Sequence, residues 1–380
     1  MTAPYQDREQ TEAKHFLLKS YLQALAFKIL RFSDLTYVDG FSGPWKTQTE
    51  NFSDSSFMIA ISALKDAQQR IFETTNKRRK VRCFFSENNP EAFAKLSEAV
   101  KPYHRPEDNF EIKTYFGEFE SAIADIKAFV GSSFALIFID PTGWTGYSFD
   151  KIRPLFAPRY CEVLINFMYG HVRRFIDSDD PATIESLNPI LGGPGWRERL
   201  DPSLPRGEAL VNIFRETLKA AGRFEHVVAT KIDKPTEDRP HFFMAYATKS
   251  YAGLVTFRDN EYRALRSYAA DRARAKGRKQ EIKSGEPDMF IEHEAEVQES
   301  SIADDVNSDM NKAAPRILEI VQRNGQIKFS GVAAIIMENY MLRETKKNVV
   351  VQLARDGKLG DTWGGGRNKP REQTLIRMNK

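Results

Sequence analysis

The chain is poor in cysteine, in long apolar stretches and in targeting signals, and each absence excludes a class of protein. Its only two cysteines, Cys83 and Cys161, lie in separate apolar stretches without the spacing of a metal site. We therefore expect buried free thiols in a reducing cytoplasm, and no bound metal. No apolar stretch approaches the roughly 20 residues that span a bilayer. The polar N-terminus also lacks the apolar centre of a secretion signal, so we expect a cytoplasmic protein with no membrane partner.

Net charge is also low, at +4 over 380 residues, which by itself does not indicate nucleic-acid binding. The charge is unevenly distributed, however. Residues 312–380 contain fourteen lysines and arginines against six acidic residues, a net charge of +8. The sequence therefore predicts a basic C-terminal surface of the kind that binds nucleic acid.

Apolar strand patterns alternate with helical patterns up to residue 258, which predicts an α/β fold. Two late strand patterns form a hairpin that adds one antiparallel strand to a mostly parallel sheet. This arrangement resembles the Rossmann-like sheet of class I methyltransferases more than a plain dinucleotide-binding sheet. The expected strands are 35–38, 81–86, 110–115, 134–139, 163–167, 226–232 and 241–248, and the expected helices are 12–30, 56–71, 91–100, 118–130 and 209–221.

Three regions are expected along the chain. Residues 1–258 form the α/β domain, with a Pro- and Gly-rich insertion at about 154–205 of the kind that covers a site or binds a partner. Residues 259–311 contain a charged helix and then an acidic stretch with few large apolar residues, which predicts a flexible linker. Residues 312–380 follow the helix–helix–helix–hairpin order of a winged-helix domain.

Three consecutive strands end in turns that suit a nucleotide-type cofactor. The first turn contains Gly40 and Gly43, which let backbone N–H groups approach a ligand closely. The second strand ends at Glu87, an acidic position that binds ribose hydroxyls, and the third ends in an aromatic turn that suits adenine. Because no GxGxxG precedes a helix here, S-adenosylmethionine is favoured over NAD; the alternative is that Glu87 and Glu118 only stabilise helix N-termini. The predicted cofactor-binding residues are Asp39, Gly40, Phe41, Gly43, Glu87, Asn88, Phe116 and Gly117.

The segment Asp140-Pro141-Thr142-Gly143-Trp144 follows the fourth strand and predicts a reaction site. In amino-methyltransferases the carboxylate and a backbone carbonyl accept hydrogen bonds from the target amine, and an aromatic ring stacks on a flipped base. We predict this role for Asp140, Pro141 and Trp144, with Tyr147 as the other candidate ring. An ordinary loop with a buried Asp cap would have a similar sequence.

A second basic segment follows the fifth strand, from Asn166 to Arg174, and includes His171 and Arg173. These side chains suit a phosphate or a substrate backbone. The alternative is the solvated start of a basic helix.

Four strings of this sequence resemble those of the three-Cys-motif partner proteins, the TcmP family. They are Lys14-His15, Tyr37–Pro44 (YVDGFSGP), Phe138–Gly143 (FIDPTG) and Glu162–Tyr169 (EVLINFMY), and the resemblance covers roughly residues 14–258. It implies a Rossmann-like methyltransferase scaffold and a partnership with a radical-SAM-like three-Cys-motif protein. Trp45 and Thr142 depart from the family strings.

In a winged helix, the third helix enters the major groove and the wing contacts the backbone or the minor groove. We therefore predict nucleic-acid contacts, with DNA as the favoured partner; a protein-interaction domain with a solvated basic face is the alternative. The predicted residues are Arg343, Lys346, Lys347, Asn348, Arg367, Lys369 and Arg371.

Two functional hypotheses follow from these patterns. The first is a methyltransferase-like protein that binds S-adenosylmethionine and acts on nucleic acid. The second is a non-catalytic DNA-binding adaptor of a three-Cys-motif protein, which the departures at Trp45 and Thr142 favour.

Overall fold

A computed structural model of the chain describes residues 9–43, 47, 49, 51–340, 348–361, 363 and 369–379, without the side chain of Asn348. It divides into two compact units, Met1–Lys249 and Ser250–Lys380. The charged helix expected after residue 258 begins earlier, at Tyr251, directly at the start of the second unit.

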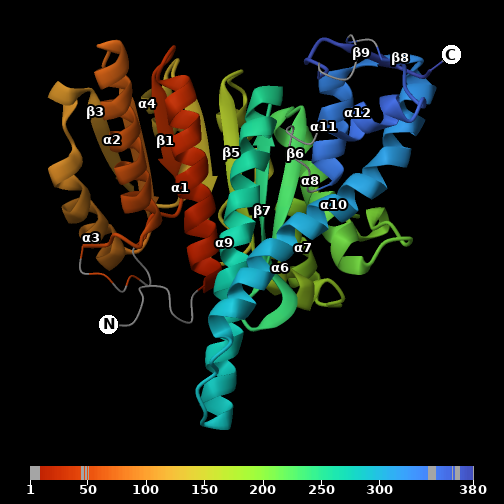
Figure 1. Ribbon diagram of the computed structural model, residues 1–380. Helices are drawn as coiled ribbons and strands as arrows, with labels where there is room; N and C mark the ends of the chain where they lie inside the picture. The colour runs from red at the N-terminus through yellow and green to blue at the C-terminus, as the bar shows by residue number, and fades with distance from the viewer. Residues whose placement is uncertain are drawn as a thin grey trace. The chain divides into compact units, whose positions relative to one another are not determined.

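The first unit is built on a seven-stranded sheet (Figure 1). Its strands are β1 (Leu35–Asp39), β2 (Val81–Glu87), β3 (Phe110–Phe116), β4 (Phe134–Ile139), β5 (Cys161–Phe167), β6 (His226–Lys234) and β7 (Glu237–Thr248). Their order is β3-β2-β1-β4-β5-β7-β6, and β7 lies antiparallel between β5 and β6. The first five strands pair in parallel. The predicted parallel sheet with one antiparallel strand is confirmed, and it is consistent with a Rossmann-like methyltransferase fold.

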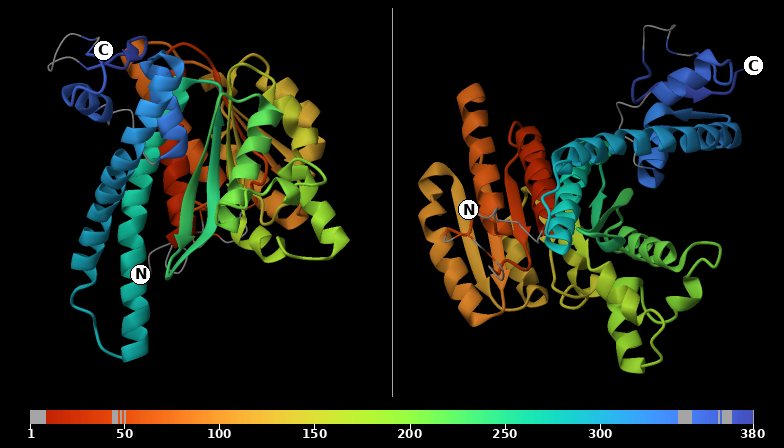
Figure 2. Two further views of the ribbon diagram at one scale, coloured as in Figure 1. Left: turned by 90° about the vertical axis from the view of Figure 1, so that its right-hand side faces the viewer. Right: turned by 60° about the horizontal axis from the view of Figure 1, so that its bottom comes forward.

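Eight helices of the described chain belong to this unit: α1 (Glu9–Ile29), α2 (Ser56–Thr75), α3 (Pro90–Val100), α4 (Ile123–Val130), α5 (Phe149–Phe156), α6 (Tyr169–Val172), α7 (Pro181–Leu191) and α8 (Arg206–Gly222). All six residues of β4 are buried, which is typical of a parallel strand covered on both faces. Its alternate residues Ala135, Ile137 and Ile139 join one hydrophobic cluster with α4, α5, α7 and α8. Helices α1 and α2 pack side by side on the other face (Figure 2).

Two stretches of this unit are more regular than the sequence predicts. The polar residues 234–240, expected as a loop, belong mostly to β6 and β7, because the turn itself is confined to residues 235–236. Pro240 is tolerated in β7 since it lies at a register shift of the hairpin. The insertion at 154–205 includes helix α7, whose Leu187 and Leu191 join the main hydrophobic cluster.

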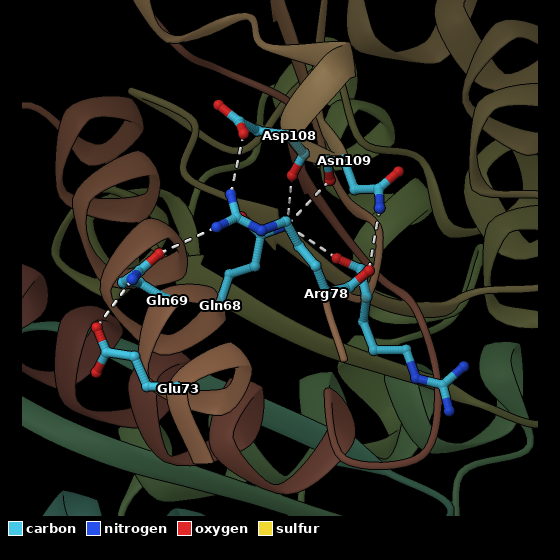
Figure 3. Close-up of polar contacts among 7 residues, drawn as sticks. Gln68, Gln69, Glu73, Arg78, Asp108 and Asn109 are labelled. Atoms are coloured by element: carbon cyan, nitrogen blue, oxygen red, sulfur yellow. Dashed lines mark hydrogen bonds and ion pairs between the residues drawn. The ribbon is translucent and has the colours of Figure 1, made fainter. Parts of the chain in front are cut away.

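A hydrogen-bonded network closes the amino ends of β2 and β3 (Figure 3). The Gln68 amide nitrogen on α2 donates to the backbone carbonyls of Arg79 at 2.8 Å, Asn109 at 3.1 Å and Asp108 at 3.3 Å. The Asn109 side chain in turn donates to the Arg78 carbonyl at 3.0 Å. Partly buried carbonyls before the start of two strands therefore obtain a donor from one buried glutamine.

The second unit begins with two long antiparallel helices, α9 (Tyr251–Ser284) and α10 (Ile291–Asn324). Residues 291–309, predicted as part of a flexible linker, are helical, so that prediction is wrong. Small residues allow the two helices to pack closely: Ala270, Ala273 and Ala295 form a cluster. A Cβ on Gly277 would lie 2.5 Å from the Ile291 side chain. Ion pairs between basic α9 and acidic α10, such as Arg274 with Glu292 at 3.0 Å, also hold the two helices together.

The remaining elements are β8 (Gln326–Lys328), α11 (Phe329–Asn339), α12 (Asn348–Arg355) and β9 (Leu375–Arg377). Strands β8 and β9 pair antiparallel, and Leu359 bridges to Met378. Apolar side chains of α10, α11 and α12 form a separate cluster that includes Ile317, Val332 and Leu353. The described residues thus contain three helices and two short strands in the order α10-β8-α11-α12-β9, and the winged-helix domain stays a prediction.

Both cysteines are buried and free, as predicted. Burial raises the pKa of the Cys161 thiol to about 12, so this thiol is unreactive at neutral pH. Among the described residues, no helix combines the length and the apolar character needed to cross a bilayer.

Candidate functional site

The turns that follow β1 to β4 enclose a pocket of about 480 Å³ at the carboxyl edge of the sheet. Backbone hydrogen bonds join neighbouring turns: the Gly40 N–H donates to the Phe138 carbonyl, and the Gly117 N–H donates to the Glu87 carbonyl, both at 3.0 Å. Open α/β sheets bind their ligands at this edge. The lining residues are Gly40, Phe41, Ser86, Glu87, Asn88, Gly117, Glu118, Phe119, Glu120, Asp140, Pro141, Thr142, Gly143, Thr145 and Gly146.

The pocket brings together most of the predicted site residues from four separate turns. Those that line it are Gly40, Phe41, Glu87, Asn88, Gly117, Asp140 and Pro141, whereas Asp39, Gly43, Phe116 and Trp144 do not line it. The Phe116 ring is 54% exposed and contacts Phe93, with ring centroids 5.2 Å apart. The aromatic ring that lines the pocket from this turn is therefore Phe119, which the sequence did not single out.

Gly40 is required at the first turn because of that ring. A Cβ at position 40 would lie 2.7 Å from the Phe119 ring, closer than any real contact. The ring also packs against Phe41, with centroids 5.9 Å apart. The missing side chain thus lets backbone and aromatic surface meet at the pocket wall.

Glu87 ends β2 and is only 4% exposed. One carboxylate oxygen accepts the backbone N–H of Asn89 at 2.7 Å, which fixes the side chain at the start of α3. Among the described residues, none donates a hydrogen bond to the other oxygen. The N-cap of α3 is Asn89, whose side chain accepts the Ala92 N–H, and Glu87 holds the backbone of this cap residue. Glu87 also lines the pocket with its other oxygen unused within the described chain, and its role toward a cofactor stays a prediction.

Asp39 lies beneath the first turn and is fully buried. Its carboxylate accepts the Phe41 N–H at 3.0 Å and the Ser56 hydroxyl at 2.7 Å. Burial raises the pKa of Asp39 to about 6, against the lowering effect of these hydrogen bonds. Asp39 thus shapes the turn and does not reach a ligand directly.

Asp140 is held by two residues of other elements. Its Oδ2 accepts the Lys14 ammonium of α1 at 2.5 Å, and its Oδ1 accepts the Asn166 amide of β5 at 2.7 Å. The pairing of Ile139 with Ile165 explains the second contact, because it places Asp140 and Asn166 on adjacent strand ends. The Asn166 carbonyl oxygen is buried and has no donor among the described residues. This unused acceptor lies beside Asp140, although Asn166 itself does not line the pocket.

Trp144 points away from the pocket. Its indole N–H donates to the Ser186 hydroxyl of α7 at 3.0 Å, and its ring packs on Phe175 with centroids 5.1 Å apart. The other candidate ring, Tyr147, is fully buried in the main cluster. Neither ring is placed to stack on a substrate base in this structure.

The contact between Lys14 and Asp140 is not predicted by the sequence patterns. A signal for it exists, because Lys14 falls at helical spacing from the buried Leu17, Leu18 and Tyr21. A charged residue on such a face needs a buried partner. The sequence does not show which carboxylate supplies it, since 126 positions separate Lys14 from Asp140.

Of the predicted nucleic-acid-binding residues, Lys369 and Arg371 are described, and both are exposed. Asn348 begins α12, but its side chain is not described. Arg343, Lys346, Lys347 and Arg367 lie outside the described residues, as does Trp45 of the first turn. No group of three His, Cys, Asp or Glu side chains within the described chain is arranged to hold a metal ion.

No family profile matches this chain, and no curated protein matches it either. The TcmP resemblance therefore stays a prediction. Similar solved structures include a Legionella pneumophila protein of family DUF519, at 12% identity and a TM-score of 0.33, over 66% of this chain and 86% of that one. They also include a loganic acid methyltransferase with SAH, at 9% identity and a TM-score of 0.29, over 81% of this chain and 92% of that one.

Proposed function

We propose that this chain is a methyltransferase-like protein that binds S-adenosylmethionine and acts on, or together with, nucleic acid. The observation that carries the proposal is the 480 Å³ pocket, which has Gly40 and Glu87 on one side and Asp140 and Pro141 on the other. A cofactor with ribose hydroxyls fits the unused acceptor of Glu87. Its adenine fits the wall formed by Gly117 and Phe119.

S-adenosylmethionine would supply an electrophilic methyl group on a sulfonium. Asp140 would hold the acceptor amine, and the backbone carbonyl of Pro141 would accept its second hydrogen bond. These two acceptors match the two N–H groups of an exocyclic amine, whose nitrogen lone pair stays free to attack the methyl group.

Nucleic acid is the proposed substrate class because of the C-terminal region. Its helix–strand–helix–helix–strand order fits a winged helix, and its net charge of +8 suits phosphate contacts. We further propose that the chain works with a three-Cys-motif protein, as its resemblance to that family's partners implies.

Methyl transfer tests the proposal. The full chain is incubated with methyl-labelled S-adenosylmethionine and, separately, with duplex DNA, single-stranded DNA and RNA, and the digested nucleosides are then analysed by mass. We expect label on an exocyclic amine, and a loss of about 100-fold in Asp140→Ala, because misplacing the acceptor costs about that much. Asp150→Ala, an exposed acid on α5, is the matched control and should keep full activity. Label on no nucleic acid removes the catalytic proposal.

A non-catalytic adaptor is the second candidate, and the Asp140 contacts favour it. Both carboxylate oxygens are already engaged, by Lys14 and by Asn166. Because a carboxylate oxygen can accept two hydrogen bonds, an acceptor amine would have to share Asp140 with Lys14 and Asn166. DNA binding without methyl transfer, with Lys14→Met giving no gain, would support the adaptor.

A further inference from the structure

Basic side chains of three segments belong to the edge of the sheet at which Asp140 lies. Lys14 on α1 contacts Asp140 itself. His171 belongs to α6 and Arg174 to the short helical turn Arg173–Phe175, both directly after β5. His241 lies on β7, two residues before Phe243, which pairs with the last residue of β5. The sheet register therefore places these segments at the same edge as Asp140.

Direct packing between α6 and β7 brings the two histidine segments together. Gly170 lies so close to β7 that a Cβ there would be 2.8 Å from the His241 carbonyl oxygen. The neighbouring Tyr169 ring packs edge-on against Phe243, with centroids 5.2 Å apart. Burial lowers the pKa of His241, and the charges of Lys234, His171, Lys14 and Arg174 lower it further. The lowered pKa favours the neutral imidazole of His241, which can donate a ring N–H.

Acidic side chains neutralise only part of this cluster. Lys14 pairs with Asp140, and Lys234 pairs with Glu237 at 3.2 Å. Among the described residues, no acidic partner contacts His171, Arg174 or His241. Arg174 is therefore a cation without a carboxylate partner within the described chain, and an anion bound beside it would supply one.

We propose that His171, Arg174 and His241 form a binding site for a phosphate group of the nucleic-acid substrate, beside the corner where Asp140 receives the base. The guanidinium forms charge-assisted hydrogen bonds with phosphate, and imidazole N–H groups add donors. The site would fix the position of the nucleotide without reading its base. This inference rests on the proposed function and names how the substrate is held.

Histidine NMR tests the proposal in the full chain. The sequence has six histidines and none after residue 293, so the basic C-terminal region contributes no histidine signal. The probe is a single-stranded DNA trinucleotide, and its uncharged methylphosphonate analogue is the control ligand. His171→Gln and His241→Gln assign two of the ring signals.

We expect the trinucleotide to shift the His171 and His241 signals and to leave the His104 signal in place, whereas the analogue shifts neither. In Arg174→Ala the trinucleotide concentration at the midpoint of the shift should rise about tenfold, because one charged hydrogen bond to phosphate is lost. Arg159→Ala, which removes an exposed arginine elsewhere in the unit, should match the wild type. Unfolding midpoints of all variants verify that they are folded.

Equal shifts with the uncharged analogue, or an unchanged midpoint in Arg174→Ala, would overturn the phosphate site. The result is separable from the methyl-transfer test. Signal shifts without methyl transfer leave the phosphate site in place and remove the catalytic proposal. Methyl transfer without signal shifts removes only this site.

Discussion

Gln68, on helix α2, and Glu87, on β2, lie at opposite edges of the same sheet. They differ in how many of their hydrogen-bonding atoms are used within the chain. Gln68, at the amino ends of β2 and β3, donates to three carbonyls of the chain. Glu87, at the carboxyl end of β2, uses one oxygen within the described chain and presents the other at the pocket.

The contrast repeats along the sheet at β5. Near its amino end, the buried Glu162 accepts hydroxyl hydrogen bonds from Tyr21 and from Thr248, the latter at 2.9 Å. At its carboxyl end, the Asn166 carbonyl oxygen is buried without a donor among the described residues. Buried polar groups are normally satisfied, and the described chain leaves some open elsewhere too, such as the Arg79 side chain near the amino end of β2. The open acceptors of Glu87 and Asn166 differ in that they lie at the pocket or beside Asp140, which is why the proposed ligands are assigned to this edge.

The largest expected effect is at the amino edge. Gln68→Ala should lower the free energy of unfolding by about 3 kcal/mol, because it removes a buried side chain and the donor of three partly buried carbonyls at once. Urea unfolding measures it, and binding of S-adenosylmethionine by the folded variant should not change. Gln69→Ala, the exposed neighbour on the same helix, should stay within about 0.5 kcal/mol of the wild type. Equal losses in both variants would contradict the assignment.

The next effect concerns the buried charge of Asp39. Its pKa is raised to about 6 in the folded state, so the folded chain holds a proton that the unfolded chain has lost between about pH 4 and 6. Stability from this group is therefore present at low pH and is lost as the pH rises through 6. Relative to Asp39→Asn, the wild type should lose about 2 kcal/mol between pH 4.5 and 6.5 in urea unfolding. Parallel pH profiles would contradict the raised pKa.

A smaller effect is expected at the pocket wall. Gly40→Ala places a methyl group against the Phe119 ring and should cost about 1.5 kcal/mol of stability. It should also weaken S-adenosylmethionine binding. Gly143→Ala, whose Cβ would meet no atom within 4 Å, should leave stability within about 0.5 kcal/mol. Calorimetric unfolding of both variants compares them, and equal losses would show that the Phe119 contact is unimportant.

The smallest effect tests the role of Trp144. Trp144→Phe removes the hydrogen bond to Ser186 and should cost about 1 kcal/mol. Ser186→Ala should cost a similar amount, and the double variant should lose less than the sum, because the two share one bond. Methyl transfer that falls more than tenfold while stability is unchanged would instead assign Trp144 to the substrate.

Much of the fold follows from the sequence because β4 is a continuous apolar stretch and β5 is mostly apolar, and a sheet covered on both faces buries such strands. The strand-end residues Glu87 and Asp140 were predicted for the same reason, since parallel strands deliver their carboxyl ends to one edge. Long-range pairing was not predictable. Lys14 and Asp140 meet only when α1 has packed on the finished sheet.

The prediction of a flexible linker at residues 291–309 was wrong for a related reason. Its few large apolar residues indicate a linker when it is considered alone. The helix forms because α9 offers small residues at Ala270 and Gly277 and opposite charges at Arg266 and Arg274. The sequence of this stretch alone cannot show that its helix is stabilised by packing against α9.

Binding of a ribose-containing cofactor by Glu87 at the carboxyl edge is the central expectation for this protein. Equilibrium dialysis of S-adenosylmethionine against the wild type, Glu87→Gln and Glu111→Gln measures this, since Glu111 is an acid near the opposite end of the sheet, on β3. We predict saturable binding by the wild type, an affinity about tenfold or more weaker in Glu87→Gln, and no change in Glu111→Gln. Absence of binding by the wild type, or equal affinity in all three proteins, would contradict the account.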